Sequence, residues 1–126
     1  MTRMLIVEDD ESVRAFTARA FEMAGFTVET AGDGLEGLEG IRRAGGRFDL
    51  VLSDIRMPAM DGIEMATAAA AEFPDMPIIL MTGYAEQRER AAELDGVVRD
   101  VVSKPFTLSE IRQRVSAVLE ESRRAA

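Results

Sequence analysis

The sequence predicts an α/β fold, a five-stranded parallel sheet that is doubly wound by helices in a (βα)5 pattern. Short apolar runs, typical of strands buried on both faces, alternate five times with segments whose apolar residues recur at helical spacing. No internal repeat, low-complexity tract or linker divides the chain. With right-handed crossovers, the strand order 2-1-3-4-5 is one of the two common solutions, and its switch point lies between strands 1 and 3.

The predicted strands are short, and the third is the one on which the candidate site depends. They cover Met4–Val7, Phe26–Glu29, Leu50–Leu52, Ile78–Met81 and a part of Val97–Val102, which Arg99 and Asp100 interrupt. The third run ends at Ser53 and Asp54, so Asp54 lies where a buried strand opens into a loop. Ligands and chemistry collect at this carboxyl edge of an open α/β sheet, although Asp is also common in turns for purely structural reasons.

Helical periodicity follows each predicted strand. In the first helix it comprises Val13, Phe16, Thr17, Ala20 and Phe21, with Gly25 as a plausible helix end. The other helices are indicated by Leu35, Leu38 and Ile41, by the alanine-rich segment Asp61–Phe73, by the charged segment Glu86–Leu94 with only Ala91, Ala92 and Leu94 to bury, and by an apolar stripe over Leu108–Leu119. We expect the last helix to end near Glu121, so that one domain covers residues 1–121 and a short flexible tail covers residues 122–126.

The composition excludes several classes of function. The chain has 126 residues, of which 47% are hydrophobic, so a disordered chain is not expected. Its net charge is −8, which makes it a poor binder of nucleic acid, because phosphate contacts need a basic face. It has no Cys and no His, which removes disulfides, thiol nucleophiles, zinc-thiolate sites and the commonest general base. No apolar run approaches the length of a membrane span and no signal-peptide pattern is present, so we expect no membrane contact and a cytoplasmic location.

Acidic side chains gather at the predicted switch point. Strands 1 and 3 are expected to be neighbours, so that Glu8 and Asp9 face Asp54. Carboxylates in one cleft repel one another unless a cation compensates, and an oxygen-only cluster suits Mg²⁺. Acids near a helix N-terminus are also favourable without any metal, and this is the preferred explanation for Asp10 and Glu11.

Two further side chains are expected at the same edge. Strand 4 delivers Thr82, and strand 5 delivers Lys104. A hydroxyl and an ammonium near a carboxylate and Mg²⁺ can hold a phosphoryl group, and Asp54 can serve as its nucleophile. Taken alone, Thr82 is also typical of a turn and Lys104 of a surface charge, and it is their joint arrival at one edge that favours the phosphoryl site.

Four segments together resemble the response-regulator receiver domains of two-component signalling. These are VEDD near the N-terminus, SDIRMPAMDG in the middle, MTG after the fourth strand and SKPF after the fifth. The resemblance covers about Arg3–Leu119. It implies that Asp54 is the phosphoacceptor and that Glu8 and Asp9 are an acidic pair, with Asp9 the more direct Mg²⁺ ligand. It also implies that the backbone carbonyl of Arg56 supplies another ligand.

The resemblance implies further roles. Thr82 corresponds to the switch hydroxyl and Lys104 to the site lysine of the family, and a cis peptide is expected before Pro105. The protein would be a phospho-acceptor switch, not an enzyme acting on free substrates, although it assists its own phosphorylation and dephosphorylation. Its donor would be a histidine kinase or a His-phosphotransfer protein. It would signal to an output protein through the face formed by the fourth helix, fifth strand and fifth helix.

One position departs from the family pattern. Many receiver domains have a Tyr or Phe three residues before the lysine, whose ring turns inward when the hydroxyl moves, and here that residue is Val101. The ring that the usual coupling needs is therefore absent from this position. Tyr84, two residues after Thr82, is a candidate substitute, although it can equally be an exposed loop aromatic.

The sequence resembles single-domain receivers of the CpdR-like, protease-adaptor kind, which also carry valine at this position and end in Ala-Ala. The output partner suggested by this resemblance is a protease or its adaptor system, and a monomer or weak dimer is expected. A terminal Ala125-Ala126 is also what a frayed helix end would contain. The alternative is a receiver module from a larger hybrid kinase or transcription regulator.

Two other functions fit the same topology. A flavodoxin-like mononucleotide binder needs a glycine- and hydroxyl-rich loop after strand 1, where this chain has four acids that repel phosphate. An Asp-nucleophile phosphatase usually has a second Asp two residues after the nucleophile, where this chain has Arg56. Both are therefore disfavoured.

Overall fold

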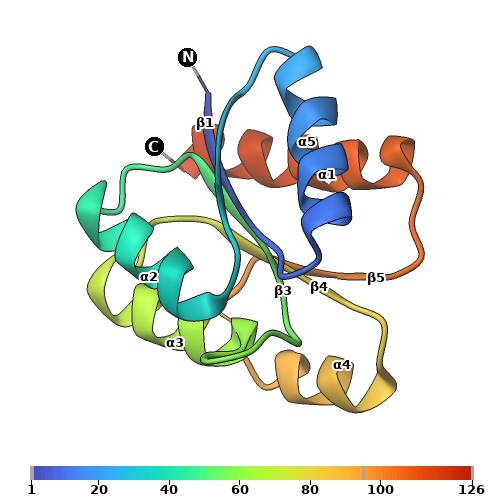
Figure 1. Ribbon diagram of the computed structural model, residues 1–126. Helices are drawn as coiled ribbons and strands as arrows, with labels where there is room; N and C mark the ends of the chain where they lie inside the picture. The colour runs from blue at the N-terminus through green and yellow to red at the C-terminus, as the bar shows by residue number, and fades with distance from the viewer. Residues whose placement is uncertain (1, 95, 126) are drawn as a thin grey trace.

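A five-stranded parallel sheet in the order β2-β1-β3-β4-β5 runs through the middle of the protein (Figure 1). It is seen in a computed structural model that describes residues 2–94 and 96–125. The strands are β1 (Arg3–Val7), β2 (Thr27–Ala31), β3 (Leu50–Asp54), β4 (Ile78–Thr82) and β5 (Asp100–Ser103). The predicted doubly wound α/β fold and its strand order are confirmed.

Helices cover both faces of this sheet. They are α1 (Glu11–Met23), α2 (Gly34–Arg43), α3 (Gly62–Glu72), α4 (Ala85–Ala92) and α5 (Leu108–Ala125). One core layer packs α1 and α5 against the sheet around Phe21 and Ile111, and the other packs α2 and α3 around Ile41 and Met65 (Figure 1). Within the described residues, no helix is both long and apolar enough to cross a bilayer.

The strand register brings the predicted site together. Val7 pairs with Ser53, so the residues after β1 emerge beside the end of β3. On the other side of β3, Asp54 pairs with Met81, and one residue later Thr82 pairs with Ser103. The ends of β1, β3, β4 and β5 therefore meet at one edge of the sheet, as expected for parallel strands.

Three helices begin at an aspartate that caps them. Asp10 accepts a hydrogen bond from the Val13 backbone nitrogen at 3.0 Å, and Asp33 does the same for α2. Asp61 and Glu64 form a reciprocal capping box at the start of α3. The helix-start explanation for Asp10 is thus confirmed, and α3 is fixed directly after the loop that follows Asp54.

Several predicted element boundaries are wrong. Strand β2 lies at Thr27–Ala31 instead of Phe26–Glu29, and β5 begins only at Asp100. The β5 boundary shifts because the backbone nitrogens of Val97 and Val98 donate to the carbonyl of Leu94 in a turn.

The predicted end of the last helix near Glu121 is also wrong. Helix α5 continues to Ala125, and Glu120 pairs with Arg123 and Arg124 one turn later. Such i, i+3 and i, i+4 pairs support the last turn of a helix. Ala126 lies outside the described residues.

Four apolar positions of the predicted helices do not reach the core. Val13 and Phe16 on α1 are 39% and 62% exposed, and Leu35 on α2 is 47% exposed. Ala92 on α4 is exposed as well, whereas Ala91 is buried. Periodicity identified the helices correctly but made their buried stripes too wide.

Candidate functional site

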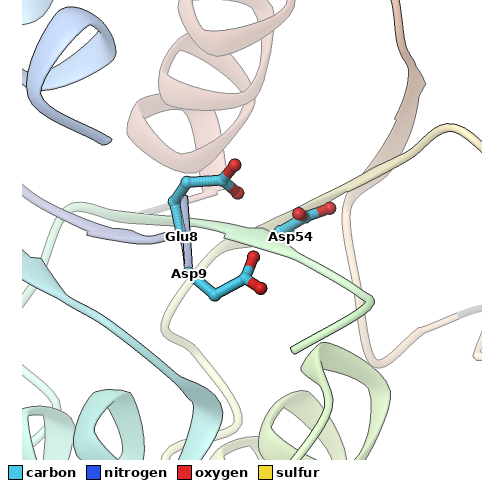
Figure 2. Close-up of side chains that lie close together, drawn as sticks. All are labelled: Glu8, Asp9 and Asp54. Carbon is cyan, nitrogen blue, oxygen red and sulfur yellow. The ribbon is translucent and has the colours of Figure 1, made fainter. Parts of the chain in front are cut away.

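Three carboxylates meet where β1 and β3 end. Asp54 is the last residue of β3, and Glu8 and Asp9 directly follow β1. One oxygen from each lies within 4.8 Å of the others, and Figure 2 shows the three groups gathered at this edge. The expected meeting of Glu8 and Asp9 with Asp54 is therefore found in the structure.

The ammonium group of Lys104 compensates two of these carboxylates. Its Nζ lies 3.2 Å from Asp54 Oδ2 and 3.4 Å from Glu8 Oε1. The lysine is delivered to this place because its backbone nitrogen donates to the carbonyl of Thr82 at 2.7 Å. The Lys104–Pro105 peptide bond is cis, as the family resemblance implied.

Burial gives Glu8 unusual acid–base behaviour. Its removal from water raises its pKa to about 7, and the neighbouring Asp54 adds to the increase while Lys104 opposes it. Burial alone would lower the pKa of Lys104, but the charges of Asp54 and Glu8 outweigh it, so that this pKa is raised. Lys104 thus stays protonated, and the site holds more negative charge than one ammonium neutralises.

The donor set fits Mg²⁺. The buried Oε2 atom of Glu8 has no hydrogen-bond partner among the described residues, which leaves it available to a cation. Asp9 is exposed and adds a second carboxylate beside Asp54. A small number of carboxylates with room for water is the kind of site that Mg²⁺ occupies, since the ion dehydrates reluctantly.

The loop after β3 holds Asp54 in place. Its Oδ1 accepts a hydrogen bond from the Ile55 backbone nitrogen at 3.0 Å. The Gly62 nitrogen donates to the Ile55 carbonyl at 2.7 Å, and any Cβ at Gly62 would press directly against the Asp54 carbonyl oxygen. Only glycine therefore lets the loop fold back so closely behind the acceptor.

Thr82 lies at the end of β4 but its hydroxyl is turned away from the carboxylates. The side chain is buried, and its Oγ1 accepts a hydrogen bond from the Tyr84 backbone nitrogen at 3.1 Å. Two acceptors lie within reach of its proton, Gln87 Oε1 at 2.9 Å and the Tyr84 carbonyl oxygen at 3.2 Å. The pocket around the carboxylates is lined by Glu8, Asp9, Asp10, Val13, Asp54, Arg56, Gly83, Tyr84 and Lys104, so Thr82 is not among these residues. In this structure Thr82 is close to the site without facing it.

Arg56 and Tyr84 both line this pocket and contact each other. The Arg56 guanidinium carbon lies 5.0 Å from the centroid of the Tyr84 ring, a distance typical of a cation–π contact. Both side chains are exposed and both line the pocket. Val101, the other switch candidate, is instead half-buried against the core layer of α2 and α3.

Two contacts of the site had no signal in the sequence. Gln87 lies on a helix that the sequence predicts to be a charged surface segment. Its bond to Thr82 depends on the conformation of the loop after β4. Arg14 donates to the Glu8 carbonyl at 3.0 Å from within α1. Both are ordinary exposed residue types in the sequence, and only the folded loop brings them to the site.

The sequence model of the family described as response regulator receiver domain matches residues 4–116. The chain belongs to this family. Receiver domains are the phospho-acceptor modules of two-component signalling, and they bind Mg²⁺ at an acidic pocket.

Individual relatives agree with this membership. The chain is 38% identical over 121 residues to the response regulator MprA of Mycobacterium ulcerans (strain Agy99). That match covers 96% of this chain and 51% of the relative, so the chain spans about half the length of the curated relatives it matches. The MprA protein of Mycobacterium leprae (strain TN) is 36% identical, with 96% and 52% covered.

Solved receiver structures superpose on the whole fold. A CheY-like receiver domain protein from Methanospirillum hungatei JF-1 has a TM-score of 0.91 at 30% identity, with 100% of this chain and 99% of that chain covered. The response regulator TrrA of Thermotoga maritima, in complex with Mg²⁺-BeF, has a TM-score of 0.84 at 30% identity, with 94% and 99% covered.

Proposed function

We propose that Asp54 of this receiver domain accepts a phosphoryl group from the phosphohistidine of a histidine kinase or a His-phosphotransfer protein. The observation that carries the proposal is the position of Lys104 Nζ, 3.2 Å from Asp54 Oδ2, beside the acidic pair Glu8 and Asp9. An aspartate with a purely structural role at a strand end does not require an ammonium and two further carboxylates beside it. Together they form a site for a group that is both anionic and metal-bound.

The chemistry is an in-line displacement at phosphorus. A carboxylate oxygen of Asp54 forms the new O–P bond, the N–P bond of phosphohistidine breaks, and the imidazole nitrogen keeps the electron pair. Lys104 already lies where it can neutralise charge on the phosphoryl oxygens. Glu8, Asp9, Asp54 and the Arg56 backbone carbonyl would hold Mg²⁺, which supplies further charge neutralisation when bound.

The output surface in this proposal is the face of α4, β5 and α5. Helix α4 is the weakest part of that face, since Ala91 is the one buried residue among its described side chains. An element with so few buried contacts is the easiest to shift. The output protein can be a separate partner, such as a protease or its adaptor system. Because the matched relatives are about twice as long as this chain, it can equally be a further domain of a larger regulator.

The decisive experiment is intact-mass measurement after incubation with Mg²⁺ and acetyl phosphate. The wild-type protein should gain one phosphoryl group, and Asp54→Asn should gain none, because an amide cannot form the acyl-phosphate. Asp75→Asn, at an exposed turn away from the site, is the matched control and should behave as wild type. An unchanged adduct in Asp54→Asn would refute the proposal.

A further inference from the structure

The hydrogen bond between Thr82 and Gln87 joins the phosphoryl site to helix α4. Thr82 is the last residue of β4, and Gln87 lies in the first turn of α4. The Thr82 Oγ1 to Gln87 Oε1 distance is 2.9 Å, and the bond is shielded because Thr82 is 2% exposed. This side-chain contact therefore connects the site directly to the helix.

Among the side chains that the structure describes, the start of α4 has few other attachments. Its N-cap residue, Tyr84, makes no capping bond with its side chain. Arg88 reaches the Ser103 hydroxyl on β5 and Arg90 reaches Asp61, but both arginines are exposed. Of these attachments, the bond from Gln87 is the one that ends on a buried partner, and it should matter most for the position of the first turn.

The Thr82 hydroxyl has a single proton to give. To hydrogen-bond a phosphoryl oxygen on Asp54, it has to donate that proton toward the carboxylates. In this structure the hydroxyl lies 2.9 Å from Gln87 Oε1 and 3.2 Å from the carbonyl oxygen of Tyr84, and Gln87 is the nearer acceptor. A bond from Thr82 to a phosphoryl oxygen therefore excludes its bond to Gln87. An interaction that favours the bond from Thr82 to the phosphoryl oxygen therefore disfavours its bond to Gln87 by the same free energy.

We propose that Gln87 is a positioning residue, a latch that holds the Thr82 hydroxyl away from Asp54 and α4 against β4 until a phosphoryl group claims the hydroxyl proton. The inference rests on the proposed phosphorylation of Asp54. It supplies the coupling that Val101 cannot, because valine has no ring to turn inward. Release of Gln87 frees the first turn of α4, which lies on the proposed output face.

The first test uses the protein without phosphoryl donor. Gln87→Ala removes the latch, and amide hydrogen exchange over residues 87–92 should become about fivefold faster, the loss expected for one hydrogen bond. Gln113→Ala, at an exposed position of α5, is the matched control and should exchange as wild type. Gln87→Glu keeps an acceptor and should retain the protection. Equal exchange in Gln87→Ala and wild type overturns the latch.

The second test measures the competition itself. Mg²⁺ with beryllofluoride serves as the phosphoryl probe, and its apparent affinity should rise about fivefold in Gln87→Ala, since Thr82 no longer has to leave Gln87. In a Thr82→Ala background the same substitution should have no effect. Additive effects of the two substitutions contradict the proposal. If acetyl phosphate fails to modify wild-type Asp54, the proposed function is wrong, while the exchange comparison still decides whether the latch exists.

Discussion

Lys104 Nζ lies 3.2 Å from Asp54 Oδ2, although the two residues are fifty positions apart in the chain. The contact exists because β3 and β5 both end at the same edge of the sheet, with β4 between them. An ammonium in this position can pair with the free carboxylate of Asp54 and also with the phosphoryl oxygens of a phosphorylated Asp54. It is therefore positioned both to assist phosphorylation and to report it to β5.

We expect Lys104→Ala to accept phosphate from acetyl phosphate about a hundredfold more slowly, since one stabilising charge is lost. Once phosphorylated, it should show smaller amide chemical-shift changes in α4, β5 and α5 than the wild type. Lys104→Arg keeps the charge and should restore part of both. Wild-type-like shift changes in phosphorylated Lys104→Ala would contradict a signalling role for the lysine.

The two acids after β1 should differ in their effect on Mg²⁺ binding. Asp9 is exposed and open to the ion, whereas Glu8 is buried and already paired with Lys104. Asp9→Ala should therefore abolish Mg²⁺ binding and phosphorylation, and Glu8→Ala should only weaken them. Titration of Mg²⁺ followed by amide chemical shifts measures both, and equal affinities in the two variants would count against the assignment.

The stability of the metal-free protein should depend on Glu8. Its pKa is 4.5 as a free side chain and about 7 in the fold, so the folded state binds the proton more tightly. The stabilisation is complete below the unfolded pKa and is lost as the pH rises through about 7. The whole change is about 3 kcal/mol at most.

Urea unfolding in the presence of a chelator, at several pH values from 4.5 to 8, measures this loss. Glu8→Gln should flatten the curve, because an amide does not titrate. Glu39→Gln, at an exposed position of α2, should leave it unchanged. If the free energy of unfolding of Glu8→Gln falls with pH as steeply as that of the wild type, a group other than Glu8 causes the pH dependence.

The carboxylate cluster was predictable because it depends on the sheet alone. Once the strand order is 2-1-3-4-5, the residues after β1 must lie beside the end of β3, whatever the loops do. Lys104 followed for the same reason. The predicted positions failed where neighbouring elements decide the outcome: Phe16 has helical spacing yet is exposed, and β5 begins late because Val97 and Val98 are held in a turn.

The orientation of side chains at the strand ends could not be predicted. Thr82 was expected to face the carboxylates, and the structure turns its hydroxyl to Gln87 instead. That choice depends on the loop from Gly83 to Tyr84, whose conformation has no periodic signal. The same holds for the contact of Arg56 with Tyr84, since each residue alone is an ordinary loop side chain.

Gly62 should be essential for reasons of space. A Cβ there would press against the Asp54 carbonyl oxygen, which belongs to the backbone and cannot move without disturbing β3. Gly62→Ala should lower the free energy of unfolding by about 1–3 kcal/mol and slow phosphorylation. At Gly40 in α2 nothing lies within 4 Å of an added Cβ, so Gly40→Ala should stabilise the protein by about 0.5–1 kcal/mol. Urea unfolding measures both variants. Equal losses of unfolding free energy in Gly62→Ala and Gly40→Ala would show that contact with Asp54 is not the cause.

The contact between Arg56 and Tyr84 should lengthen the life of the phosphorylated form. Both side chains line the pocket, with the Arg56 guanidinium carbon 5.0 Å from the Tyr84 ring centroid, and we expect the pair to restrict the approach of water to a phosphoryl group on Asp54. Such a cation–π contact contributes about 0.5–1 kcal/mol at an exposed site, so Tyr84→Ala should shorten the half-life about two- to fivefold. Tyr84→Phe keeps the ring and should retain most of the wild-type half-life. Arg56→Ala should match Tyr84→Ala, and the double variant should be no faster than either, because both remove the same contact. Loss of phosphate followed by intact mass gives the rates of the wild type and of all four variants. If Tyr84→Ala decays as slowly as the wild type, the pair does not guard the site.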